Sequence, residues 1–312
     1  MVDYTYMFRS ELPLDEAWPI TWDIFISAFD GSERVVQVFD KVVANGKFWI
    51  AHNEYGFAES DKPESAFTSP ADNEAEFISN FIGSRLSSHD LPSLRLCVDI
   101  TGFMRPHLMI LVKMLSKLGV RRLDAIYSEP THYAKREMTE FSDKAVSSVR
   151  QVAGFEGYVQ NDTSNDILVI GAGYESHLIA EVAEDKEKAD RVVIFGLPSL
   201  RADMYQQNRL RVREASDSIG DTATGKYFAP ANNPFVAASV LSELVAKREA
   251  KRPVTNLYLA PLATKAQALG FALFYIHECE GKAVSILYPF SSVYSPDSSR
   301  GISRAWLCEM EL

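Results

Sequence analysis

The residues of this sequence that are best suited to bind a small molecule stand directly after apolar, β-rich runs. Residues 98–103 read Val-Asp-Ile-Thr-Gly-Phe, so Asp99 ends one such run. An unpaired carboxylate is costly to bury there, and Asp99 is expected to meet a hydroxyl, backbone amides, a cation or a metal. Capping of the next helix competes with ligand contact as its role. Thr101 and Gly102 permit close approach of a ligand, and Arg105 offers positive charge to a phosphate.

Two further loops carry features of phosphate sites. Gly171 and Gly173 follow an apolar run and match the first two glycines of a dinucleotide fingerprint, but Ser176 stands at the third position. The next strand ends without the acid that a ribose requires, which disfavours NAD, FAD and S-adenosylmethionine; close strand-helix packing is the competing interpretation. Thr264 and Lys265 begin a helix, where an anion is stabilised, although no P-loop is present.

Catalytic signals are weaker. Glu129 ends a strand, where it is either a general base or a carboxylate that stabilises a turn, and Asp99 is the other candidate acid-base residue. The sequence contains neither Gly-x-Ser-x-Gly nor His-Glu-x-x-His, and its 6 histidines are scattered. The 3 cysteines lack a Cys-x-x-Cys spacing, and we expect buried, reduced thiols. We predict no metal site, and the pattern selects no cofactor.

These loops must be held by strands and helices, which the apolar pattern locates. Strands are expected over residues 22–29, 47–52, 94–100, 121–127, 166–170, 191–195, 256–260, 283–288 and 305–311. Helices are expected from Ser32 to about Asn45 and over residues 74–86, 108–118, 141–152, 175–188, 204–215, 235–247 and 266–278.

The alternation of strands and helices predicts an α/β fold. None of the strand pairs is joined by a tight hairpin signal, which favours a Rossmann-like, mostly parallel arrangement with helices on both sheet faces. We expect two related halves, residues 1–155 and 156–312, with a single wide sheet as the alternative. Ligands of such sheets bind at the carboxyl ends of strands. The candidate loops are residues 29–34, 99–105, 127–130, 171–175, 196–200 and 261–265.

Composition restricts the partners. The net charge of −10 disfavours a surface that coats nucleic acid or anionic lipid. No apolar run approaches the roughly 20 residues that cross a bilayer, so we expect no membrane association and a cytoplasmic location.

The run 98–103, an apolar strand leading into Asp-x-Thr-Gly and a helix, resembles the ligand loop of the CRISPR-associated Rossmann-fold (CARF) sensor domains and of the related SAVED domains. Those families bind cyclic oligonucleotides at such strand ends. Phe103 and Met104 stand where a second glycine and a basic or hydroxyl residue usually follow. The resemblance implies a sensing or adaptor subunit of a bacterial anti-phage defence complex.

Three hypotheses follow. The leading one is a binding module that holds a nucleotide-like ligand and works with a protein partner or as a homo-oligomer. The second is an enzyme acting on a nucleotide or a phosphosugar. The third is a structural subunit without an active pocket, whose segments 54–73 and 201–231 bind a partner.

Overall fold

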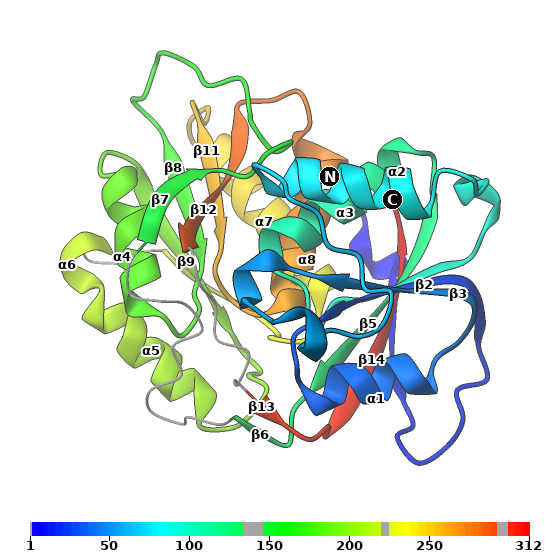
Figure 1. Ribbon diagram of the computed structural model, residues 1–312. Coiled ribbons are helices and arrows are strands. Elements are labelled where there is room, and N and C mark those ends of the chain that lie inside the picture. The colour runs from blue at the N-terminus through cyan, green and yellow to red at the C-terminus, as the bar shows by residue number, and fades with distance from the viewer. Residues whose placement is uncertain (1, 134–145, 220–224, 292–298) are drawn as a thin grey trace. The chain divides into compact units, whose positions relative to one another are not determined.

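The chain folds into two compact α/β units, each built on its own six-stranded, mostly parallel sheet (Figure 1). The computed structural model describes residues 2–133, 146–219, 225–291 and 299–312. We call residues 7–143 and 293–312 the Asp99 unit, and residues 1–6 and 144–292 the Gly171 unit. The units therefore follow the sheets rather than a single cut along the chain.

The sheet of the Asp99 unit has the strand order β1-β14-β5-β4-β2-β3. The strands β2, β3, β4 and β5 are parallel, whereas β14 runs antiparallel to β5 and β1 antiparallel to β14. Their bounds are β1 Phe8–Leu12, β2 Thr21–Phe29, β3 Val43–Ala51, β4 Leu96–Asp99, β5 Arg122–Glu129 and β14 Arg304–Glu311. A separate antiparallel pair is formed by β6 (His132–Tyr133) and β13 (Ser299–Arg300).

Three α-helices accompany this sheet: α1 (Glu33–Lys41), α2 (Glu74–Arg85) and α3 (Arg105–Lys117). The helix α1 packs against β2, β4 and β5, and α2 packs against α3. The Asn73 side chain caps α2 by accepting hydrogen bonds from the amides of Ala75 and Glu76. Pro106 lies in the first turn of α3, where its missing amide proton costs nothing. Short 3₁₀ turns are η2 Asn53–Tyr55, η3 Glu59–Asp61 and η4 Leu91–Ser93.

The sheet of the Gly171 unit has the order β10-β9-β8-β11-β12-β7, with only β7 antiparallel to its neighbour. Its strands are β7 Val146–Gln151, β8 Ile167–Gly171, β9 Asp190–Gly196, β10 Lys226–Ala229, β11 Leu257–Pro261 and β12 Val284–Ser291. Its helices are η1 Tyr4–Tyr6, α4 Ser176–Asp185, α5 Met204–Glu214, α6 Ser216–Ile219, α7 Pro234–Glu249, α8 Lys265–Phe274 and the π-helical turn η5 Tyr275–Cys279.

The central strands are buried along their whole length, which is why they read as continuous apolar runs. All of β4, β8 and β11 is buried. Cys97, Cys279 and Cys308 are buried free thiols, as expected. Burial raises the pKa of Cys308 to about 12 and that of Cys279 further, so the reactive thiolate is disfavoured at both.

Two sequence-based predictions of secondary structure are wrong. Residues 146–151 form β7 instead of part of a helix over 141–152, because they pair with β12; residues 141–145 lie outside the described residues. Asn45 and Gly46 do not end the first helix. That helix ends at Lys41, and Gly46 lies inside β3, where it is the register partner of Ile24.

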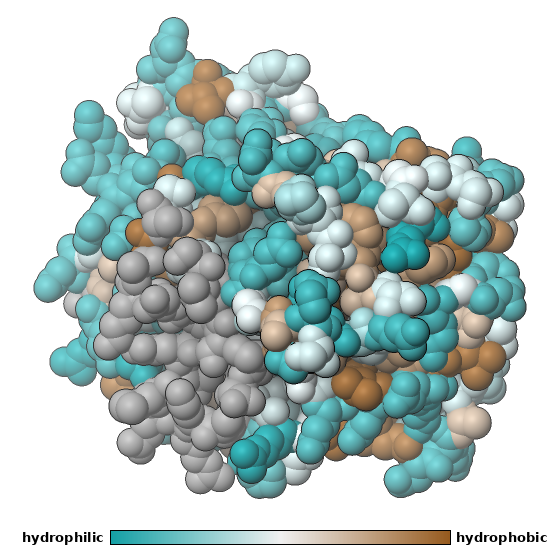
Figure 2. All heavy atoms as spheres, in the orientation of Figure 1, coloured by the Kyte–Doolittle hydropathy of each residue, from teal (hydrophilic) through white to brown (hydrophobic). Residues whose placement is uncertain are grey.

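In the part of the chain that the structure describes, no helix has the length and apolarity needed to span a bilayer. On the face drawn in Figure 2, apolar residues are scattered among hydrophilic ones.

Candidate functional site

The carboxyl ends of β2, β4 and β5 bring polar side chains together at one edge of the sheet in the Asp99 unit. Ser27 of β2 is the register partner of Asp99, and Asp99 in turn is the partner of Ile126 in β5. Polar residues at or just after these strand ends therefore meet: Asp30 after β2, Thr101 after β4, and Ser128 near the end of β5. We call this group the Asp99 edge.

Asp99 organises the loop that follows its strand. Its side chain is fully buried, at 0% exposure. One carboxylate oxygen accepts from the Ser27 hydroxyl at 3.0 Å, and the other accepts from the Thr101 amide at 3.0 Å. Burial raises the pKa of Asp99 to about 6, against the hydrogen bonds from Thr101 and Ser27, which lower it. Asp99 therefore exchanges its proton near neutral pH while serving as an internal acceptor.

The raised pKa predicts a specific pH dependence of stability. The folded chain keeps the Asp99 proton up to a pH of about 6, whereas the unfolded chain releases it near the ordinary value of 3.8. Asp99 therefore lowers the free energy of unfolding as the pH rises from about 4 to 6, by roughly 3 kcal/mol in full. Asp99→Asn removes the charge: its Oδ1 can accept from the Thr101 amide, and its Nδ2 can donate to the Ser27 hydroxyl, so we expect it to remove this decline. Urea unfolding of both proteins across pH 4 to 7 measures the difference, and parallel pH profiles would refute the assignment.

Thr101 and Gly102 join the strand ends to one another. The Thr101 hydroxyl accepts from the Ser128 amide at 3.0 Å and shares a hydrogen bond of 3.1 Å with the Ser128 hydroxyl. Gly102 lies against the end of β2, since a Cβ at this position would stand 1.8 Å from the Ala28 carbonyl oxygen. The close approach that the sequence predicts at Gly102 is thus made by the protein's own backbone.

Arg34 lies against the Asp99 edge and was not among the residues that the sequence analysis named as candidates. It lies in the first turn of α1, is 8% exposed, and donates through one terminal nitrogen to the Ser128 carbonyl at 2.7 Å. Within the described residues, its Nε has no hydrogen-bond acceptor, and no carboxylate forms an ion pair with it. The only feature of the sequence that could have indicated Arg34 is its position at the end of the candidate loop 29–34.

The remaining predicted residues of this unit have different surroundings. Glu129 is 3% exposed, and its carboxylate accepts from the Trp306 indole nitrogen at 2.6 Å. This bond ties β5 to β14, which is a structural use of the carboxylate. Arg105 is half-buried and begins α3.

The other predicted residues gather in the Gly171 unit. Gly171 ends β8 and is the register partner of Pro261, which ends β11. A Cβ at Gly173 would stand 2.1 Å from the Leu262 carbonyl oxygen, so the two loops touch. Thr264 caps α8 by accepting from the Gln267 amide at 3.2 Å, and its hydroxyl donates to the Ala231 carbonyl. Lys265 begins α8 and is half-buried. The predicted ligand residues therefore form two groups, one in each unit.

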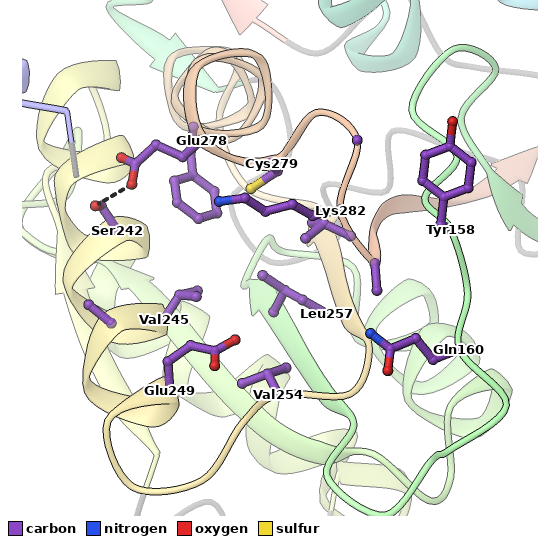
Figure 3. A pocket seen from close by; sticks show the side chains of 15 residues that line it. Tyr158, Gln160, Ser242, Val245, Glu249, Val254, Leu257, Glu278, Cys279 and Lys282 are labelled. Atoms are coloured by element: carbon purple, nitrogen blue, oxygen red, sulfur yellow. Dashed lines mark hydrogen bonds between the residues drawn. The ribbon is translucent and has the colours of Figure 1, made fainter.

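A pocket of about 780 Å³ lies in the Gly171 unit, at the amino ends of β11 and β12 (Figure 3). Leu257 and Phe274 form an apolar part of the pocket wall, whereas Glu249 and Lys282 place charged side chains in it. Glu278, also in the wall, accepts from the Ser242 hydroxyl at 3.0 Å and from the Tyr4 hydroxyl at 3.1 Å. None of the residues predicted to bind ligand lines this pocket.

Comparison with known proteins adds no assignment, since no family model matches this chain and no curated protein matches its sequence.

Proposed function

We propose that this chain is a binding module, and that the Asp99 unit holds the phosphate of a nucleotide-like ligand at the Asp99 edge with Arg34. The observation that carries this proposal is the buried Arg34 guanidinium, whose Nε lacks an acceptor and which pairs with no carboxylate among the described residues. A buried cation is costly unless an anion balances it. The planar guanidinium matches the oxygens of a phosphate.

The surroundings of Arg34 support an anion at this edge. Arg34 lies at the amino end of α1, where the helix dipole favours negative charge. The nearby carboxylates are already occupied: Asp30 accepts from the Ser32 amide at 2.9 Å and from the Ser32 hydroxyl at 2.6 Å, and Asp99 accepts from Ser27 and Thr101. The position of the Asp99 edge at the carboxyl ends of parallel strands also supports the proposal, because ligands of open α/β sheets bind there.

The resemblance of residues 98–103 to the CARF and SAVED ligand loops narrows the ligand within this proposal. If the resemblance reflects kinship, the ligand is a cyclic oligonucleotide, and the chain acts as a sensor with a partner in anti-phage defence. The same phosphate chemistry would also serve a linear nucleotide, so both types belong in the test.

Binding is favoured over catalysis because both candidate acid-base residues are used internally. Asp99 is fully buried, and Glu129 holds the Trp306 indole. An enzyme acting on a nucleotide or phosphosugar remains the alternative, and turnover separates it from a binding module.

The test is mass spectrometry of small molecules released from the purified, full-length chain. We expect a phosphate-bearing nucleotide in near-stoichiometric amount. The purified chain is then incubated with ATP, with a cyclic dinucleotide and with a cyclic oligoadenylate, and its thermal unfolding is measured. A ligand that raises the unfolding temperature and is recovered unchanged supports the proposal. If the chain instead converts the ligand to a product, the chain is an enzyme and the binding module is refuted. The binding proposal is overturned if the purified chain releases no nucleotide and none of the three probes raises its unfolding temperature.

A further inference from the structure

Two buried histidines and one glutamate converge beside the strand ends of the Asp99 unit. His52 directly follows β3, Glu54 lies in the 3₁₀ turn η2, and His107 lies in the first turn of α3. His107 is distant in sequence from His52 and Glu54, and the two segments are joined by the Met104 amide, which donates to the His52 Nε2 at 3.4 Å. The parallel order of β3, β2 and β4 brings their loops to one edge.

The spacing of the three side chains suits a shared ion. One ligand atom from each of His52, Glu54 and His107 lies within 4.8 Å of the other two. The His107 Nε2 is 3.8 Å from a Glu54 carboxylate oxygen, which is beyond hydrogen-bond distance. Ligand atoms around a tetrahedral zinc ion lie about 3.4 Å apart, given bonds of about 2.1 Å. A modest inward movement of Glu54, the most exposed of the three, would close the group on an ion.

The burial and the aromatic neighbours of His52 and His107 favour binding of a cation between them. His52 is 1% exposed and His107 is 5% exposed, and their ring centroids are 4.4 Å apart. Phe77 packs edge-on against His107 at 5.3 Å, and Phe103 packs against His52 at 5.6 Å. Aromatic walls exclude water, so charges inside them interact strongly. A divalent cation would bind both imidazole rings in their neutral form and would be balanced in part by the Glu54 carboxylate.

We propose that His52, Glu54 and His107 form a binding site for a divalent transition metal of the zinc class. Imidazole nitrogens select such metals over Mg²⁺ and Ca²⁺, which prefer oxygen ligands. This proposal departs from the sequence-based prediction of no metal site. Three protein ligands leave a coordination position for water or for a bound molecule. The proposal is independent of the phosphate role of Arg34.

The test is titration of the tag-free, chelator-treated full-length chain with Zn²⁺ in competition with a chromophoric chelator. We expect one tightly bound equivalent, together with a higher temperature of thermal unfolding. Glu54→Gln and His107→Asn each remove one ligand, and each is expected to weaken Zn²⁺ binding by at least roughly 10- to 100-fold. His89→Asn is the matched control, because His89 is exposed and lies outside the group; its Zn²⁺ affinity should equal that of the unaltered chain.

A second readout does not depend on how the variants fold. X-ray absorption at the zinc edge of the unaltered, loaded chain should show scattering from two imidazole rings. The proposal is overturned if Glu54→Gln binds Zn²⁺ as tightly as the unaltered chain, if no equivalent binds, or if the spectrum lacks imidazole scattering.

Discussion

Replacing Arg34 by glutamine is expected to weaken binding of ATP or a cyclic nucleotide to this chain by roughly 10- to 100-fold, the range for a lost hydrogen bond to a charged group. The glutamine amide nitrogen reaches only to the position of the Arg34 Nε, two bonds short of the terminal nitrogen that donates to the Ser128 carbonyl, so this bond to β5 is lost together with the charge. What disappears is the positive charge and the paired donors that face a phosphate. Isothermal titration calorimetry at low and high salt measures both the affinity and its electrostatic part.

Two further variants make this result interpretable. Arg34→Lys keeps the charge without the planar fork and should fall between the two extremes. Arg191→Gln is the control, because Arg191 belongs to the Gly171 unit and donates to the Ala183 and Glu187 carbonyls. Equal losses in Arg34→Gln and Arg191→Gln, or an unchanged affinity in Arg34→Gln, would remove Arg34 from the site.

The second large effect is expected at Gly102. In Gly102→Ala the new Cβ would stand 1.8 Å from the Ala28 carbonyl oxygen and 2.9 Å from its carbon, both backbone atoms that cannot move aside cheaply. Overpacking of this kind typically costs about 1–3 kcal/mol, and we expect the upper end of that range because no flexible side chain is available to yield. Urea unfolding measures the change in the free energy of unfolding.

Gly83→Ala provides the matched substitution. Gly83 lies within α2, and a Cβ there would meet nothing within 4 Å. Alanine is the better helix former, so this variant should be stabilised by up to about 1 kcal/mol. If Gly102→Ala is as stable as the unaltered chain, the loops after β2 and β4 are not in the contact described here, and the account of the Asp99 edge fails.

Most strands and helices were predictable because their apolar runs end at strong turn signals. The runs around Asp99 and Gly171 are strands in the structure, and the helix begun by Pro106 forms as expected. Parallel pairing was also predictable, because no tight turn joins these strands, and it is confirmed for both sheets. Strand ends in such sheets share an edge, so the sequence predicts that the loops after Asp99 and after Phe29 lie at one edge; that these two loops are neighbours depends on the strand order, which the sequence does not give.

Features that depend on distant pairing were not predictable. Residues 146–151 form a strand because their backbone pairs with the edge of β12. The strand β14 belongs to the Asp99 unit because it pairs with β5. Arg34 ends one of the candidate loops, but nothing in the local sequence indicates that the end of β5 lies against its guanidinium. The grouping of His52, Glu54 and His107 needs the order β3-β2-β4, which local pattern does not encode.

The most direct test of the proposed site observes the Arg34 Nε–H group by NMR. Its resonance is assigned by its loss in Arg34→Lys. If a phosphate fills the place of the missing acceptor, this resonance shifts on addition of ATP or a cyclic dinucleotide at concentrations that saturate the thermal shift, while that of Arg191 stays in place. An Arg34 resonance that does not move when the chain is saturated would contradict the proposal.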